Sequence, residues 1–260
     1  MAEVKTKEQI LDLFPQHTSL VMYRGSVSHN TFVPPEQPNS SDDVDLMGVY
    51  FAPVLKYIGL GKVKEVKESF IGQYDIVSYE FRKMVRMLLK ANPNVMSILW
   101  LNKDHYLKSN LYGKALVDNR DWFVSKRIYR TYTKYAENEL RKMDKKVFKG
   151  YMGARRKKVV ETYGFDCRHA SHCIRLLRMG YEFTTTGELT VYRTKDAQEL
   201  IDIKNGKWTL EEVKDEANRL FGLAESAYKK CDLPEEPETA KVEKLVGEVM
   251  YDYITSNYGR

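Results

Sequence analysis

Two aspartates spaced two residues apart, Asp43 and Asp45, constrain this chain more than any other feature. They stand where a polar loop runs into the apolar segment 47–51, MGVYF, which is typical of a strand. Side chains two apart in a strand point to the same face. Two carboxylates on one face repel each other unless a cation lies between them, and oxygen-only ligands favour Mg²⁺ or Mn²⁺. The pair therefore predicts a strand that binds a divalent metal ion, although Asp-x-Asp is also ordinary chemistry for a loop.

A tight turn precedes the aspartates. The apolar and aromatic run 20–23 leads directly into Gly25-Ser26, and sixteen residues separate Ser26 from Asp43. We expect a strand, a Gly-Ser turn, a loop and a second strand in this order.

A third carboxylate follows in the segment 73–80, QYDIVSYE, whose β-branched and aromatic residues predict another strand. A two-metal site needs such a carboxylate on a neighbouring strand. Asp75 is our first choice for it and Glu80 our second. The alternative is a surface acid on an edge strand.

The segment 164–180, GFDCRHASHCIRLLRMG, is the other unusual stretch. In a helix that begins near Asp166, the residues Arg168, His172 and Arg175 share one face, and a carboxylate at the helix start is favourable. Such a face suits phosphate, which needs charge-assisted donors. Two alternatives remain. The histidines and cysteines of this stretch could bind zinc, although no matching pair of ligands occurs elsewhere. The helix could also be a core helix with hydrogen-bonded histidines and solvated arginines.

The order of predicted elements indicates an α+β protein with a small mixed-sheet domain at 1–105 and a mostly helical domain at 106–260. We expect a helix at 5–14, a strand or hairpin at 63–69, an amphipathic helix at 81–91, and a strand or buried helical turn at 95–101. The linker is expected near 103–110. Beyond it we expect one short strand at 189–192 and helices at 111–119, 122–143, 155–163, 168–179, 196–204, 210–230 and 240–257.

Composition narrows the class of protein. No apolar run approaches the ~20 residues of a membrane span, and the charged N-terminus does not read as a secretory signal. Three irregularly spaced cysteines indicate reduced thiols in the cytoplasm. A net charge of +6, with basic runs at 145–146 and 155–158, fits a nucleotide or nucleic-acid ligand.

These motifs resemble the polymerase-β-type nucleotidyltransferase superfamily, which carries a Gly-Ser turn, a loop and an Asp-x-Asp strand. From about residue 20 to about residue 255 the chain is similar to a phage and bacterial subgroup of predicted nucleotidyltransferases, some of them associated with RNA ligases. That similarity rests on KANPN at 90–94, DCRHASHCIRLL at 166–177, GELTV at 187–191 and LPEEP at 233–237. The chain departs from the subgroup near Ser97, usually a glutamate, at Arg168, usually a lysine, and in its longer loop after Ser26.

The resemblance implies a two-metal enzyme that uses Mg²⁺ or Mn²⁺ held by Asp43, Asp45 and Asp75, which are then both the metal ligands and the catalytic residues.

It also implies that a nucleoside triphosphate, ATP among the candidates, is bound by Gly25, Ser26, Arg168, His172 and Arg175. Glycine lets the backbone approach the phosphates closely.

The acceptor implied by the resemblance is an RNA 3′ end, tRNA included, in the cytoplasm, or in the host cytoplasm if a phage encodes the chain. A protein or small-molecule hydroxyl is the next choice. A non-catalytic nucleotide- or RNA-binding module is the alternative outside enzymes. The sequence leaves the base preference and the oligomeric state open.

Overall fold

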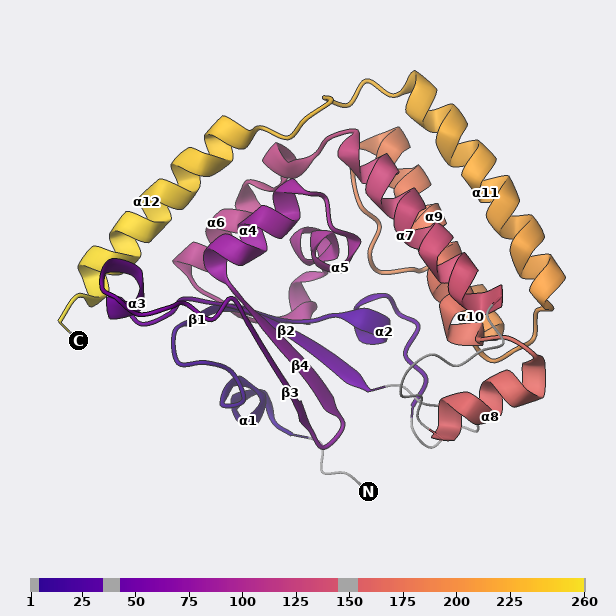
Figure 1. Cartoon of the computed structure of the whole chain (residues 1–260), viewed down its shortest axis with the longest axis horizontal. Coiled ribbons are helices and arrows are strands. Elements are labelled where there is room, and N and C mark those ends of the chain that lie inside the picture. The colour runs from indigo at the N-terminus through magenta and orange to yellow at the C-terminus, as the bar shows by residue number, and fades with distance from the viewer. Residues whose placement is uncertain (1–4, 35–42, 145–153, 260) are drawn as a thin grey trace.

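The computed structural model describes residues 5–34, 43–144 and 154–259. A five-stranded sheet occupies one part of the molecule, and long helices form the rest (Figure 1). The architecture is α+β, as predicted. Within the described residues, no helix combines the length and the apolar character that crossing a membrane requires.

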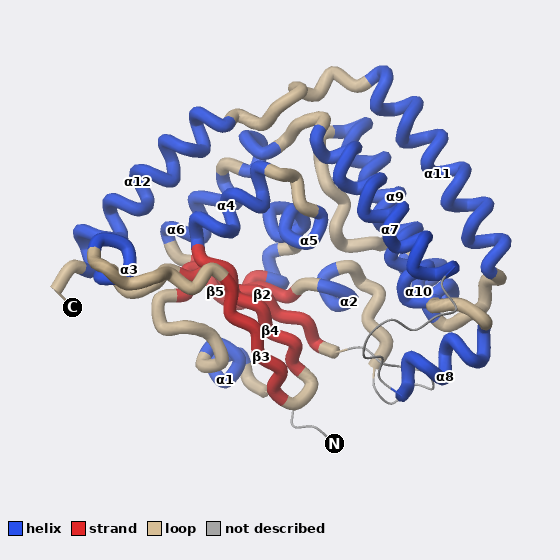
Figure 2. The backbone as a smooth tube through the Cα atoms, viewed as in Figure 1, coloured by secondary structure: helices blue, strands red, loops and turns tan. Residues whose placement is uncertain are grey.

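The sheet has the strand order β3-β4-β2-β1-β5, shown in red in Figure 2. The strands β2 and β4 run parallel, whereas the other neighbouring pairs are antiparallel. The parallel register places Asp45 directly beside Asp75. The strands are β1 (Thr18–Tyr23), β2 (Val44–Tyr50), β3 (Val66–Ile71), β4 (Tyr74–Glu80) and β5 (Tyr106–Ser109).

Both faces of the inner strands β1, β2 and β4 are covered, whereas residues 67–71 of the edge strand β3 are exposed. Val21, Leu46 and Ile76 pack toward α1 (Lys7–Leu11), the small helix beneath the sheet in Figure 1. The alternate residues Met22, Met47 and Val77 belong to a larger core that includes the buried face of α4 (Phe81–Leu89). Asp45 and Asp75 share this second face, because they alternate with Leu46 and Ile76. The carboxylates therefore lie on the side of the sheet where the long helices are.

The helix α9 (Cys167–Thr186) is the centre of the helical half and packs against α7 (Arg127–Asp144), α10 (Ala197–Lys204) and α11 (Leu210–Lys230). The axes of α7 and α9 approach closely, since a Cβ at Gly180 would lie 2.9 Å from the Cβ of Tyr132. The remaining helices are α2 (Gly25–Ser28), α3 (Leu55–Ile58), α5 (Pro93–Met96), α6 (Leu111–Asp118), α8 (Ala154–Tyr163) and α12 (Thr239–Asn257), with 3₁₀ turns η1 (Ser97–Trp100), η2 (Lys103–His105) and η3 (Arg120–Phe123).

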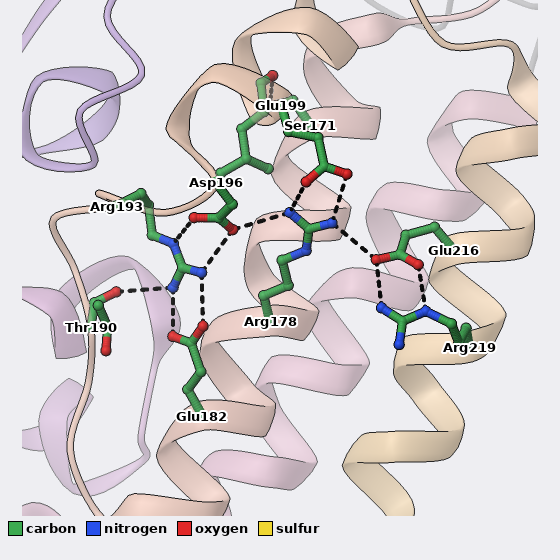
Figure 3. A network of polar contacts seen from close by, with 10 residues as sticks. Ser171, Arg178, Glu182, Thr190, Arg193, Asp196, Glu199, Glu216 and Arg219 are labelled. Atoms are coloured by element: carbon green, nitrogen blue, oxygen red, sulfur yellow. Dashed lines mark hydrogen bonds and ion pairs between the residues drawn. The ribbon is translucent and has the colours of Figure 1, made fainter.

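An ion network fastens the C-terminal half of α9 to its neighbours (Figure 3). Arg178 contacts Asp196, Glu199 and Glu216, at 2.9–3.1 Å. Arg193 contacts the carboxylates of Glu182 and Asp196. The network thereby fixes α10, α11 and the segment 187–196 against α9.

Most predicted elements are confirmed, and three local predictions need correction or completion. The segment 103–110 is not a linker, because β5 within it pairs with β1. Residues 189–192 form no strand, and their backbone bonds to residues near α2 instead. Residues 95–100 are helical, in α5 and η1, and Leu101 is extended.

Some of the predicted features lie outside the described residues. These are most of the loop before Asp43, at 35–42, the basic run at 145–146, and the side chains of 155–156. Lys157 and Lys158, the rest of the second basic run, are exposed.

Candidate active site

The Gly-Ser turn lies at the end of β1, where the chain enters the short helix α2. Gly25 has a φ of +60°, and a Cβ there would lie 1.9 Å from Oδ2 of Asp45. Only glycine allows both this left-handed backbone and this close approach to the carboxylate. The backbone N–H of Arg24 donates to the carbonyl oxygen of Asp45 at 3.0 Å, which extends the pairing of the two strands up to the turn. The turn is thus packed directly against the first strand carboxylate.

Asp45 and Asp75 form a carboxylate pair across β2 and β4. Nη2 of Arg24 lies 3.4 Å from Oδ1 of Asp45 and 3.2 Å from Oδ2 of Asp75. Asp43 stands immediately before β2 and is exposed. Two of the three predicted carboxylates therefore meet around one cation of the chain itself.

This pair fits a divalent metal ion in its chemistry. Burial and the neighbouring Asp75 and Asp43 raise the pKa of Asp45, although Arg24 acts in the opposite direction. More positive charge would relieve this cost, and the donor atoms are the carboxylate oxygens that Mg²⁺ and Mn²⁺ prefer. Among the described residues, no three acidic, histidine or cysteine side chains already converge as a metal-binding group.

Glu80, the second choice for the third carboxylate, lies at the other end of β4, opposite Tyr50. Its side chain is buried and caps α4 by accepting from the backbone N–H of Lys83 at 3.0 Å. It also accepts from the hydroxyl of Tyr57 at 2.8 Å. These contacts explain Glu80 as a helix cap, and Asp75 is the carboxylate that lies beside Asp45.

A cavity of about 890 Å³ opens between the end of the sheet and the helices α7 and α9. It brings together the predicted residues Gly25, Ser26, Asp45, Arg168, His172 and Arg175. Its other lining residues are His29, Thr31, Asn94, Tyr135, Asn138, Glu139, Arg141, Lys142, His169, Ser171 and Lys204. Basic side chains outnumber carboxylates around it, so the cavity favours an anionic ligand.

Arg175 is the most unusual cation of this cavity. Its Nη1 lies 2.7 Å from Nε2 of His29 and 3.3 Å from Sδ of Met179. No carboxylate of the described residues forms an ion pair with it, and burial lowers its pKa to about 10. A guanidinium cannot accept a hydrogen bond, so Nε2 of His29 accepts and Nδ1 donates to the carbonyl oxygen of Val191, 3.1 Å away. His29 is therefore neutral and does not compensate the charge of Arg175.

Glu139 of α7 organises the two histidines of α9. Its carboxylate contacts Nδ1 of His169, lies 3.5 Å from Nδ1 of His172, and receives Nζ of Lys142 at 2.7 Å. Despite its burial, these donors hold the pKa of Glu139 well below its usual range. Burial lowers the pKa of His172, which favours its neutral form. The histidines are thus held in place at the wall of the cavity.

The alternatives for α9 can now be judged. Zinc has no support, because Cys167 and Cys173 belong to no converging group of metal ligands among the described residues, and all three cysteines are free. Burial raises the pKa of the Cys167 and Cys173 thiols to about 12 each. The histidines are hydrogen-bonded, as expected for a core helix, but Arg175 and Arg178 lie inside the protein and not in solvent. Asp166 caps the helix by accepting from the backbone N–H groups of Arg168 and His169.

A smaller hollow of about 400 Å³ lies on the other side of Asp75. It is lined by Arg24, Glu68, Ser69, Phe70, Asp75, Val77 and Tyr79. Phe70 is paired with Asp75 across β3 and β4, so the two side chains share one face, and Phe70 is 62% exposed. Arg24, Asp45 and Asp75 therefore stand between two hollows.

Three residues of the site were missed by sequence reasoning, namely Arg24, His29 and Glu139. Arg24 directly precedes the Gly-Ser turn, and this position was the available signal. His29 and Glu139 gave none, because their partners lie 146 and 30 residues away in the chain.

Two comparisons with known proteins find a match. A family model described as RlaP, RNA repair pathway DNA polymerase beta family, matches residues 37–247. The match spans the three aspartates and all of α9, and begins after Gly25-Ser26. A solved structure of a nucleotidyltransferase-like protein from Exiguobacterium sibiricum 255-15 is 15% identical, with a TM-score of 0.28 over 91% of this chain and 75% of that chain. No curated protein matches the chain in sequence.

Proposed function

This chain belongs to the RNA repair pathway DNA polymerase beta family, and we propose that it transfers a nucleoside monophosphate from a nucleoside triphosphate to an RNA 3′ end, tRNA included. The family and fold are those of a polymerase-β-type nucleotidyltransferase. The observation that carries the proposal is the cavity that joins the Gly25-Ser26 turn and Asp45 to the buried cation of Arg175.

The triphosphate would occupy this cavity. Arg175 offers a charge that no carboxylate of the described residues pairs, and Gly25 and Ser26 line the same cavity. Ser26 and Arg168 line the same wall and would bind the β- and γ-phosphates, with His172 beside them. Binding energy at these phosphates would position the α-phosphate next to Asp45, and positioning accounts for most of the catalysis in such reactions.

The carboxylates of Asp43, Asp45 and Asp75 would hold Mg²⁺ or Mn²⁺. A bound ion would supply neutralisation of the charge that develops on the phosphate oxygens. The acceptor hydroxyl would release its proton to water, and its oxygen would form a bond to the α-phosphorus while the bond from that phosphorus to the bridging oxygen breaks and pyrophosphate leaves. Asp75 is the more exposed of the paired carboxylates and faces the second hollow, so it is placed to orient the acceptor hydroxyl.

The second hollow supports a nucleic-acid acceptor. An exposed aromatic ring next to a reactive centre is the platform on which a base of a single strand stacks. Phe70 provides that ring on the same face as Asp75. A protein side chain would need no such platform.

We further propose that the catalytic domain includes the whole sheet, and therefore extends past residue 105 to the end of β5 at Ser109, and that the helical domain follows. The reaction would take place in the cytoplasm, or in that of the host if a phage encodes the chain.

The test follows both ends of the nucleotide. Each NTP is supplied with the label on either the α- or the γ-phosphate, together with Mg²⁺ and either total RNA, tRNA or protein. The proposal expects α-label on RNA and γ-label in pyrophosphate. γ-label on the acceptor would indicate phosphoryl transfer, and α-label on protein would replace RNA as the acceptor class. Absence of any transfer, with Mg²⁺-dependent NTP binding intact, would indicate a binding module.

A further inference from the structure

Arg24 occupies the space between two carboxylates that lie side by side. Its Nη2 contacts Asp45 at 3.4 Å and Asp75 at 3.2 Å, and all three side chains are partly buried at the end of the sheet. The proposed function assigns these two carboxylates to a divalent ion. A metal ion bound between the two oxygens that face Arg24 would take the place of the guanidinium, since metal–oxygen distances of ~2.1 Å leave no room for both cations.

Arg24 makes few contacts for a partly buried arginine. One of its three nitrogens makes both carboxylate contacts, and its Nε is buried without a hydrogen-bond partner among the described residues. Arg178 and Arg193 differ sharply (Figure 3). Both nitrogens at the tip of Arg178 contact carboxylates, and Arg193 binds two carboxylates through all three of its nitrogens.

This difference in contacts distinguishes an arginine that is fixed in place from one that can move. A guanidinium with bidentate partners is fixed, because each additional bond uses its rigid fork. A guanidinium held by one nitrogen at 3.2–3.4 Å, with another N–H unsatisfied, has little to lose by moving. Arg24 also lines the hollow beside Asp75, so it borders open space.

We propose that Arg24 is a displaceable internal cation, which neutralises Asp45 and Asp75 in the metal-free protein and gives way when a divalent ion binds. This inference rests on the proposed function. Arg24 thereby competes with the metal ion, lowers its affinity in the absence of nucleotide, and prevents the paired carboxylates from binding metal tightly before the triphosphate arrives. A displaced Arg24 remains beside the reaction centre, next to the phosphates of either substrate.

The test measures Mn²⁺ binding without nucleotide, by the loss of the electron paramagnetic resonance signal of free Mn²⁺. The variants are Arg24→Gln, which removes the charge, and Arg24→Lys, which keeps it. We expect Arg24→Gln to bind Mn²⁺ about tenfold more tightly than the wild type, because one positive charge a few ångströms from the ion has been removed. Arg24→Lys keeps the positive charge, so its affinity for Mn²⁺ should be close to that of the wild type and lower than that of Arg24→Gln.

Two controls make the result decisive. Circular dichroism confirms that each variant is folded, and Asp45→Asn in the Arg24→Gln background should abolish the tight Mn²⁺ site. Equal or weaker binding by Arg24→Gln, with Mn²⁺ binding still dependent on Asp45, would overturn the role of Arg24 and leave the proposed function standing. Absence of Asp45-dependent Mn²⁺ binding in every variant would overturn both.

Discussion

Arg175 and Arg178 lie one turn apart on α9, yet their surroundings differ completely. Arg178 contacts three carboxylates, and these hydrogen bonds raise its pKa despite burial (Figure 3). Arg175 has a neutral histidine and a thioether as its contacts, and its pKa is lowered to about 10 by burial. One arginine is already neutralised by the protein, whereas the other keeps its charge for a ligand.

The two regions illustrate a general rule about buried charge. A buried ion that is fully paired stabilises a particular arrangement of elements, and removing one partner is costly. A buried ion without a counter-charge is costly in the free protein, and binding of an opposite charge recovers that cost. We therefore propose that the ion network around Arg178 stabilises the fold and that the cavity at Arg175 binds the substrate.

The largest effect on nucleotide transfer is expected from a substitution in the carboxylate pair at the cavity. Asp45→Asn should lower nucleotide transfer by roughly 10³-fold or more, because the paired carboxylates no longer bind the metal ion. Its matched control is Glu216→Gln, which weakens the network at Arg178 and should reduce stability while leaving transfer by the folded protein unchanged. Single-turnover assays and thermal unfolding separate the two. Transfer by Asp45→Asn at the wild-type rate would refute the assignment of the metal site.

The arginines themselves give the next test. Arg178→Met should lower the free energy of unfolding by about 3 kcal/mol, because Glu199 loses its counter-ion. Asp196 keeps Arg193 and Glu216 keeps Arg219, so these two carboxylates stay paired. Arg175→Met should change stability by about 1 kcal/mol or less, and should lower transfer roughly 100-fold. Urea unfolding and kcat/KM measure these values. A larger loss of unfolding free energy in Arg175→Met than in Arg178→Met would contradict this distinction between the two arginines.

A smaller effect, on the KM for an RNA acceptor, is expected from one face of β3 and not from the other. Phe70→Ala should raise the KM for an RNA acceptor about tenfold, because a stacked base contributes roughly 1–3 kcal/mol. Ile71→Ala is the matched control, since Ile71 is 40% exposed and points to the opposite face of the same strand. Equal effects of the two substitutions on KM would argue against an acceptor site at Phe70.

The smallest expected effect is a pH dependence. Burial, and then the charge of Arg175, lower the pKa of His29 well below its usual value. Below about pH 6.5 the unfolded chain therefore binds a proton at His29 that the native protein does not. The contribution of neutral His29 to the free energy of unfolding is fully present above this pH. Below it, this contribution falls by at most about 1.4 kcal/mol per pH unit. His29→Asn should flatten the slope between pH 6.5 and pH 5 in urea unfolding, and an unchanged slope would contradict the neutral histidine.

Local pattern was sufficient to predict much of the fold. The strands around Asp45 and Asp75 follow from β-branched and aromatic residues, and parallel pairing then places these aspartates together. Asp166 was predicted at the start of α9 because carboxylates favour that position, and it caps the helix there.

What the sequence could not reveal depends on contacts between distant segments. Residues 189–192 look like a strand, but the carbonyl oxygen of Val191 accepts from His29, and the backbone of Arg193 bonds to the backbone of His29 and the side chain of Asn30. Likewise, no local pattern distinguishes Arg175 from Arg178. The positions of Asp196, Glu199 and Glu216, all outside α9, decide which arginine is neutralised.

The most direct test of the central claim is the binding of inorganic tripolyphosphate, which needs no knowledge of the base. Isothermal titration calorimetry in the presence of Mg²⁺ compares the wild type with Arg175→Met. We predict one tripolyphosphate per wild-type chain and an affinity at least about tenfold lower for Arg175→Met, which corresponds to 1.4 kcal/mol or more. Equal affinities, or no binding by the wild type, would contradict the proposal that this cavity binds a triphosphate.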